Sequence, residues 1–356
     1  MESLKTTRYI ACPVDRRRRV QVSVPLTLDA LFTRTGQPPG YYHAGRRVIP
    51  CARSHMQAFE AQELAWEAPW QGHARLAIVF PGVRHGDPNL WCLGLPLDEQ
   101  GMLQPGPRDA LIERLLHSMN APDRAEKEDL TSEPLAFQPD TLTLAMLHAR
   151  ITHDLALPAS SWWQPAHEAL TIADTGRHWS TLGLQGVADT VVRRTREEEM
   201  QIAERLPHLS VEALHALCYC LEHAPPATDA LVTALWLRSQ AEIEATASFR
   251  ACQRAGISSE LPDAAKWVDT LLRHEPDDET LAVIAARGWS HLEHEERLKL
   301  FLDHLARRPS ASFRALISDL ALIPRLRLPV LMLMRQADRD TPLAHQVRMM
   351  LGKTAS

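Results

Sequence analysis

The stretch LAIVF at residues 76–80, followed after a polar turn by NLWCLGLPLDEQGMLQPGPRDALIERLL at residues 89–116, decides the fold of the N-terminal part of the chain. Short apolar runs bounded by Pro, Gly and Asp predict two strands. Pro107-Arg108-Asp109 predicts the start of a helix whose apolar face runs from Leu111 to Leu116. The order strand, turn, strand, acidic turn and helix is typical of the centre of a small α+β domain.

The residues before this stretch add one helix, a hairpin and a second short helix. Thr27 is expected to cap a helix that ends near Gly36, because Leu28, Leu31 and Phe32 fall on one helical face. Residues 41–49 predict a hairpin with Gly45 at the bend. Ser54 is expected to cap the next helix, which carries Met56 and Phe59.

With 356 residues the chain is long enough for two domains. The pattern predicts an α+β domain followed by an all-α, HEAT-like or irregular multi-helix domain, so that the chain is predominantly α overall. The expected divisions are a basic tail over residues 1–22, the α+β domain over 23–120, a polar linker over 121–139 and the helical domain over 140–353.

Helical period dominates after residue 140. Polar residues that suit the N-cap position precede the apolar stripes, namely Asp140, Ser210, Thr228, Asp263 and either Asp277 or Asp278. Short loops that contain Pro join the expected helices, which favours antiparallel neighbours. The sequence shows no strict repeat, so an irregular α-solenoid and a multi-helix bundle both remain open.

Composition and charge exclude several classes of protein. Apolar residues make up 45% and charged residues 23%, as in ordinary globular proteins. Six scattered cysteines do not resemble a disulfide scaffold. The absence of a long apolar run or a secretory signal predicts a cytoplasmic protein that does not bind membranes. A net charge of −5 does not resemble that of a dedicated nucleic-acid binder.

Basic residues nevertheless leave a nucleic-acid alternative open. Arg16, Arg17, Arg18 and Arg19 are consistent with a solvated tail or with binding to an anion, and a start of translation near Val20 would remove them. Together with Arg193, Arg194 and Arg196 they give a weaker hypothesis of RNA or ribosome association.

Several stretches resemble the bacterial domain-of-unknown-function family 3549. The most specific is Trp91-Cys-Leu-Gly-Leu-Pro-Leu-Asp-Glu-Gln-Gly101; others are Gly45-Arg-Arg47, Leu184-Gln-Gly-Val-Ala-Asp189 and Arg287-Gly-Trp289. The resemblance covers roughly Leu26 to the C-terminus and implies a shared two-part fold, but no reaction. Two residues depart from the family pattern, because Gly94 stands where Lys is usual and Gly288 where Cys is common.

Two strings of residues resemble metal sites, but their spacing argues against metal binding. His215, Cys218, Cys220 and His223 would point to different faces of one helix, whereas zinc needs converging ligands. His291, Glu293, His294 and Glu295 lack the H-E-x-x-H spacing of zinc proteases and predict a solvated helix face. We therefore expect no metal and no cofactor.

The candidate binding surface consists of polar residues near the predicted strand ends: Arg46, Arg47, Asp98, Glu99, Gln100 and Arg108. A pair of arginines suits a phosphate or a carboxylate, and an internal salt bridge of one arginine, for example to Asp98, is the simpler alternative. Asp98-Glu99 suits a structural turn more than acid–base chemistry. Trp162, Trp163, Trp179, Trp236, Trp267 and Trp289 are expected in helix packing, or else in a protein-binding groove.

These observations predict a non-enzymatic protein that binds another macromolecule, most simply another protein. The alternative is an enzyme of unrecognised type that uses Asp98 and Glu99 with Arg46 or Arg47 around a pocket between the domains. The sequence contains neither a nucleotide-binding loop nor a nucleophile elbow. It does not define the oligomeric state.

Overall fold

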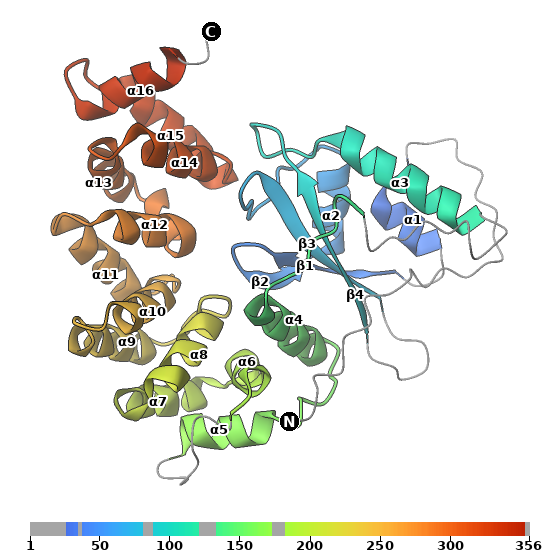
Figure 1. Cartoon of the computed structure of the whole chain (residues 1–356), viewed down its shortest axis with the longest axis horizontal. Helices are drawn as coiled ribbons and strands as arrows, with labels where there is room; N and C mark the ends of the chain where they lie inside the picture. The colour runs from blue at the N-terminus through green and yellow to red at the C-terminus, as the bar shows by residue number, and fades with distance from the viewer. Residues whose placement is uncertain (1–25, 35–37, 81–87, 121–132, 173–181, 353–356) are drawn as a thin grey trace. The chain divides into compact units, whose positions relative to one another are not determined.

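The computed structural model describes residues 26–34, 38–80, 88–120, 133–172 and 182–352. They form two compact units (Figure 1). We call Met1–Gly45 with Ile49–Pro139 the α+β unit, and Arg46–Val48 with Asp140–Ser356 the helical unit. The predicted tail, residues 1–22, lies outside the described residues.

The α+β unit is built on an antiparallel sheet with strand order β2-β1-β3-β4. Its elements are α1 (Leu28–Arg34), β1 (Gly40–Ala44), β2 (Val48–Cys51), α2 (Arg53–Glu60), β3 (His73–Phe80), β4 (Asn89–Pro96) and α3 (Pro105–Asn120). The two strands that the opening stretch predicts are β3 and β4, and they pair with Leu76 opposite Leu93. The predicted hairpin is β1 and β2.

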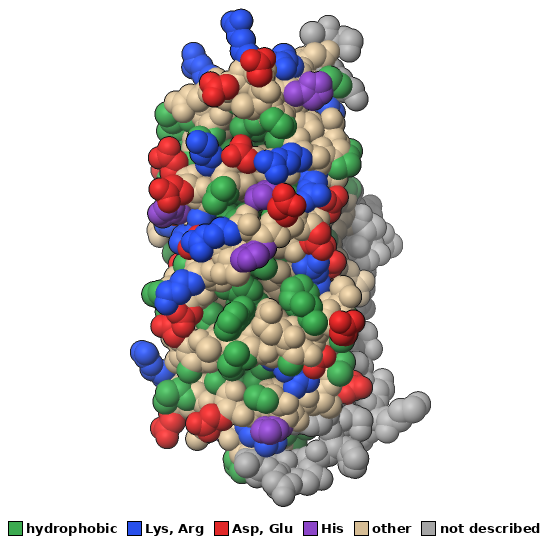
Figure 2. All heavy atoms as spheres, turned by 90° about the vertical axis from the view of Figure 1, so that its left-hand side faces the viewer, with side chains coloured by type: hydrophobic (Ala, Val, Ile, Leu, Met, Phe, Trp, Pro, Cys, Tyr) green, Lys and Arg blue, Asp and Glu red, His purple; other side chains and the backbone are tan. Residues whose placement is uncertain are grey.

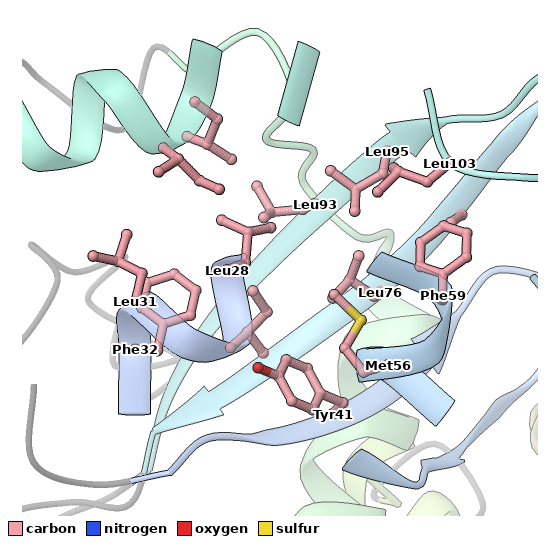
Figure 3. Close-up of a cluster of buried hydrophobic side chains, with 14 of the residues drawn as sticks. Leu28, Leu31, Phe32, Tyr41, Met56, Phe59, Leu76, Leu93, Leu95 and Leu103 are labelled. Atoms are coloured by element: carbon pink, nitrogen blue, oxygen red, sulfur yellow. The ribbon is translucent and has the colours of Figure 1, made fainter. Parts of the chain in front are cut away.

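Apolar side chains of the three helices pack on one face of this sheet (Figure 3). Phe32 of α1 and Phe59 of α2 lie in the same cluster as Leu76 and Leu93. The Thr27 hydroxyl accepts the Ala30 amide at 3.1 Å, as predicted for the cap of α1.

The starts of α2 and α3 differ from the prediction. Helix α2 begins at Arg53 after Ala52, so Ser54 lies inside its first turn instead of capping it. Helix α3 begins at Pro105, two residues before Pro107, because the fixed φ of proline suits the first helical position.

Part of the stretch that composition placed in a linker packs against the sheet. Leu135 O accepts the Gly94 amide at 2.8 Å, and the Phe137 amide donates to Cys92 O at 3.1 Å. Glu133 is buried and receives two hydrogen bonds from Arg114, at 3.0 and 2.6 Å. Residues 133–137 therefore satisfy backbone groups along β4, which a polar composition alone does not indicate.

The helical unit consists of two layers of helices (Figure 1). The first layer contains α5 (Trp163–Thr171), α7 (Arg196–Arg205), α9 (Asp229–Ala241), α11 (Pro262–Arg273) and α13 (Glu295–Ala306). The second layer contains α4 (Thr141–Asp154), α6 (Leu184–Arg193), α8 (Val211–Leu221), α10 (Thr246–Ile257), α12 (Asp278–Arg287) and α14 (Ser310–Ala321). Successive helices of each layer are neighbours, which confirms the HEAT-like alternative.

The first layer repeats with a period that the sequence analysis did not find. The first residues of its five helices are each 33 residues apart. The seventh residue of each helix is buried, and these residues are Ala169, Ile202, Leu235, Val268 and Phe301. They share only apolar character, so the repeat exists in packing positions and not in residue identity.

Most of the predicted caps are confirmed. Asp140, Ser210, Thr228 and Asp277 each accept a backbone amide at the start of a helix. Asp263 does not, because α11 already begins at Pro262.

The unit ends with α15 (Pro324–Gln336) and α16 (Pro342–Gly352); short 3-10 helices follow α7 (η3, Leu206–His208) and α12 (η4, Trp289–Glu293). None of the helices in the described ranges is long and apolar enough to cross a membrane.

Candidate functional site

A row of charged side chains joins the C-terminal ends of three successive second-layer helices. Glu222 follows α8, Arg254 lies in the last turn of α10 and Arg287 ends α12. The Glu222 carboxylate is 4% exposed and accepts Arg254 Nε at 2.8 Å and Arg287 Nε at 2.7 Å. We call these three residues the polar ladder. Each carboxylate oxygen has its own guanidinium, as a buried charge requires.

Arg46 and Arg47, which belong to the helical unit, lie beside the polar ladder. The Arg46 guanidinium is fully buried, donates to Ala285 O at 2.9 Å and is paired with Asp319. The Arg46 carbonyl accepts a hydrogen bond from Arg287.

Arg47 is held by a different set of groups. Its guanidinium donates to Ser258 O at 2.5 Å and lies 4.4 Å from the Trp289 ring centroid. It is also 3.7 Å from Glu260, an exposed carboxylate. Arg46 therefore forms the kind of internal salt bridge that the sequence suggests, but with Asp319 and not with Asp98.

Burial controls the electrostatics of this region. It lowers the pKa of Arg46 despite the opposing charge of Asp319, and it lowers the pKa of Arg47 to about 10. Burial also lowers the pKa of His223 to about 3, and the positive charges of Arg287 and Arg47 act in the same direction. His223 is therefore neutral at physiological pH, and its Nδ1 has no hydrogen-bond partner among the described residues.

The chemistry open to this cluster is restricted. The guanidinium groups of Arg46, Arg254 and Arg287 bind carboxylates or carbonyls of the helical unit itself. An incoming phosphate or carboxylate would have to displace these internal partners. The arrangement fits a structural role, in which the polar ladder holds residues 46–48 within the helical unit.

Asp98, Glu99 and Gln100 form the turn that follows β4. Asp98 Oδ1 accepts the amides of Gln100 at 2.7 Å and Met102 at 2.9 Å. Gly101 has a φ of 76°, which favours glycine. Glu99 and Gln100 are exposed. The Asp98 carboxylate therefore shapes the turn.

Arg108 is engaged elsewhere in the α+β unit. It is 5% exposed and donates to Glu60 O at 3.1 Å and to Asp109 at 2.8 Å. Glu60 in turn accepts the Leu28 and Asp29 amides at the start of α1. Within this unit, Asp98 and Arg108 thus have separate partners.

The two metal-like strings contain buried residues with ordinary partners. Cys218 and Cys220 are fully buried, and His215 Nε2 lies 3.0 Å from Ser248 Oγ. His291 is buried with Nε2 3.1 Å from Ile257 O, so the expected solvated helix face at residues 291–295 is wrong there. No group of three or more potential metal ligands occurs in the part of the chain that the structure describes.

The arginines of the nucleic-acid hypothesis are only partly available. Arg194 is 7% exposed and donates to Glu199 and to the carbonyls of Ala224 and Pro225. Arg193 donates to Thr152 and to Leu157 O. Arg196 is exposed.

Two tryptophans that the sequence analysis assigned to packing have large exposed fractions. Trp162 is 52% exposed and Trp236 is 41% exposed, whereas Trp267 is buried as expected. Trp179 lies outside the described residues. Leu237, next to Trp236, is 57% exposed, and Met200 on α7 is 45% exposed. Figure 2, which shows the first-layer side of the helical unit, has hydrophobic side chains gathered about its middle and lower part.

Sequence reasoning missed the polar ladder, although a signal was present. Arg254 and Arg287 are separated by 33 residues, the period of the first layer. Arg287 also begins the Arg287-Gly-Trp289 motif. A search for polar residues at this spacing would have identified both arginines.

Comparison with known proteins gives a family but no activity. No curated protein and no solved structure matches the chain. The model of the family described as "Protein of unknown function (DUF3549)" matches residues 26–351, which include both units. The chain therefore belongs to the DUF3549 family.

Proposed function

We propose that this protein is a non-enzymatic binding protein, an adaptor that contacts another protein through the first layer of its helical unit. The observation that carries the proposal is the exposure of the adjacent side chains Trp236 and Leu237 on α9. Tryptophan is enriched among residues that dominate binding energy at protein interfaces. Stacked helical hairpins suit such a role, because they bury their cores against neighbours and leave extended faces open.

The state of the charged residues also favours binding over catalysis. Arg46, Asp98 and Arg108 are all engaged in local hydrogen bonds that stabilise the fold. An enzyme that used them would need them oriented toward a substrate. The proposed role is therefore assigned to the first layer and not to the arginine pair.

Cross-linking in cells that produce the protein tests this proposal. Lys266 on α11 and Lys299 on α13 are exposed and occupy equivalent positions in the repeat, so an amine-reactive cross-linker samples the first layer directly. We expect one protein to be recovered in near-stoichiometric amount, with cross-links to Lys266 or Lys299. Recovery of the chain alone, together with turnover of a metabolite by the purified protein, would overturn the proposal.

A further inference from the structure

One face of the first layer combines exposed apolar side chains with acidic ones. Met200 on α7 occupies the position equivalent to Thr233 on α9, 33 residues later, and both are exposed. Trp236 and Leu237 follow Thr233 by three and four residues, so they share its side of α9. Helices α7 and α9 are neighbours in the layer. We call Met200, Trp236, Leu237, Glu197 and Glu204 the acidic apolar patch.

The two glutamates of the patch lie on the same face of α7 as Met200. Glu197 precedes Met200 by three residues and Glu204 follows it by four, and both are exposed. Over residues 196–245 the chain carries three Arg and no Lys against nine Asp and Glu, a net charge of −6. Two of the three basic residues are Arg196 and Arg205, at the ends of α7, and the third, Arg238, is paired with Glu242 at 2.8 Å.

The same layer changes character beyond α9. The positions equivalent to Met200 on α11 and α13 are Lys266 and Lys299. The acidic apolar patch is therefore a local feature of α7 and α9, and the next helices of the layer place lysines at the equivalent position.

We propose that the acidic apolar patch binds a basic amphipathic helix of a partner protein. Leu or Phe side chains on one face of such a helix would pack against Trp236 and Leu237, as in helix-in-groove recognition. Lys or Arg side chains at its edges would lie opposite Glu197 and Glu204. The charge of this face also attracts a cationic segment over a distance comparable to the Debye length, which makes association sensitive to salt. This inference rests on the proposed function and adds the chemistry of the partner.

Two synthetic peptides with one apolar face test the inference. Both are amphipathic 14-residue helices with leucines at the same positions, and they carry either Lys or Glu on the polar face. Fluorescence anisotropy of the labelled peptides, titrated with the full chain, gives the affinities. We expect the Lys peptide to bind at least tenfold more tightly than the Glu peptide, and its affinity to fall as salt rises.

Variants of the full chain locate the binding site. Trp236→Ala with Leu237→Ala should weaken the Lys peptide at least tenfold, and Glu204→Lys should weaken it and reduce the salt dependence. Leu300→Ala is the matched control, because Leu300 is 41% exposed on the first-layer helix α13 and lies outside the patch. All substituted side chains are exposed, so circular dichroism melting should show unchanged folding.

Several results would overturn the inference. Equal affinity of the two peptides, or no effect of the double variant, would show that this chemistry is not recognised. A dimer in light scattering that the double variant abolishes would assign the patch to a second copy. A gain in peptide affinity on replacing Arg16–Arg19 by Glu would assign it to the chain's own basic segment. If neither peptide binds while a partner is still cross-linked at Lys266 or Lys299, this inference fails and the proposed function stands.

Discussion

Replacement of Gly186 by Ala tests the packing of the first helical pair. Gly186 is the third residue of α6, and a Cβ built on it would lie 2.1 Å from the carbonyl oxygen of Trp162 and 2.7 Å from its carbonyl carbon. It would also lie 3.0 Å from Ala166 Cβ on α5. Because the nearest atoms belong to the backbone, no side-chain rotation relieves the clash. The segment at Trp162 would have to move away from α6 by about 1 Å to reach an ordinary contact.

The expected free energy follows from two opposing effects. Overpacking of a well-packed site costs typically 1–3 kcal/mol, and the rigid backbone contact puts this site at about 3 kcal/mol. Ala in a helix gains up to about 1 kcal/mol relative to Gly. Gly186→Ala should therefore lower the free energy of unfolding of the helical unit by about 2 kcal/mol.

Urea unfolding of the full chain, followed by far-ultraviolet circular dichroism, measures this loss, and hydrogen exchange of the α6 amides assigns it to the helical unit. The matched control is Gly352→Ala at the end of α16, where an added Cβ would meet nothing within 4 Å. The control should stay within about 0.5 kcal/mol of the unchanged chain. If Gly186→Ala behaved like the control, the close approach of α6 to Trp162 would be refuted.

Three further predictions address the polar ladder, the buried histidines and the turn after β4. Glu222→Leu should destabilise the helical unit by about 3 kcal/mol in urea unfolding, because it leaves Arg254 and Arg287 without their carboxylate; a loss below about 1 kcal/mol would contradict the polar ladder. Burial lowers the pKa of His43 to about 4 and that of His223 to about 3, so the unfolded chain, with histidine pKa values near 6.5, binds more protons between these values. Stability should therefore fall as pH drops below about 6.5, by about 2 kcal/mol per histidine at pH 5, and His223→Asn should reduce the slope of urea midpoint against pH; an unchanged slope would rule out a buried neutral His223. Asp98→Ala should cost about 1–2 kcal/mol through loss of two amide acceptors, whereas Asp98→Asn should retain most of the stability, and equal losses in thermal melting would contradict the turn.

Local pattern was sufficient for elements whose causes are local. The cap at Thr27, the hairpin around Gly45 and the two strands from His73 to Pro96 follow from side-chain alternation and turn residues. The caps at Asp140 and Ser210 follow for the same reason. Asp263 failed as a cap because Pro262, one residue earlier, is itself favoured at the first helical position.

The remaining features depend on residues far apart in the sequence. Arg46 is paired with Asp319, 273 residues away, and no local pattern reveals such a partner. The exposure of Trp236 depends on how α7 and α9 pack, whereas its residue type favours a core position. The 33-residue period escaped notice because Ala, Ile, Leu, Val and Phe alternate freely at the same packing position.

Quantitative capture from native cells tests the claim of protein binding through the first layer most directly. Tagged chains with the natural sequence, with Trp236→Ala and Leu237→Ala, and with Leu300→Ala would be purified in parallel, and the co-purifying proteins measured by mass spectrometry. We predict one partner in near-equimolar amount, reduced at least tenfold by the double variant and retained by Leu300→Ala. Recovery of every chain without a partner, or equal recovery of the partner by the double variant, would contradict the account.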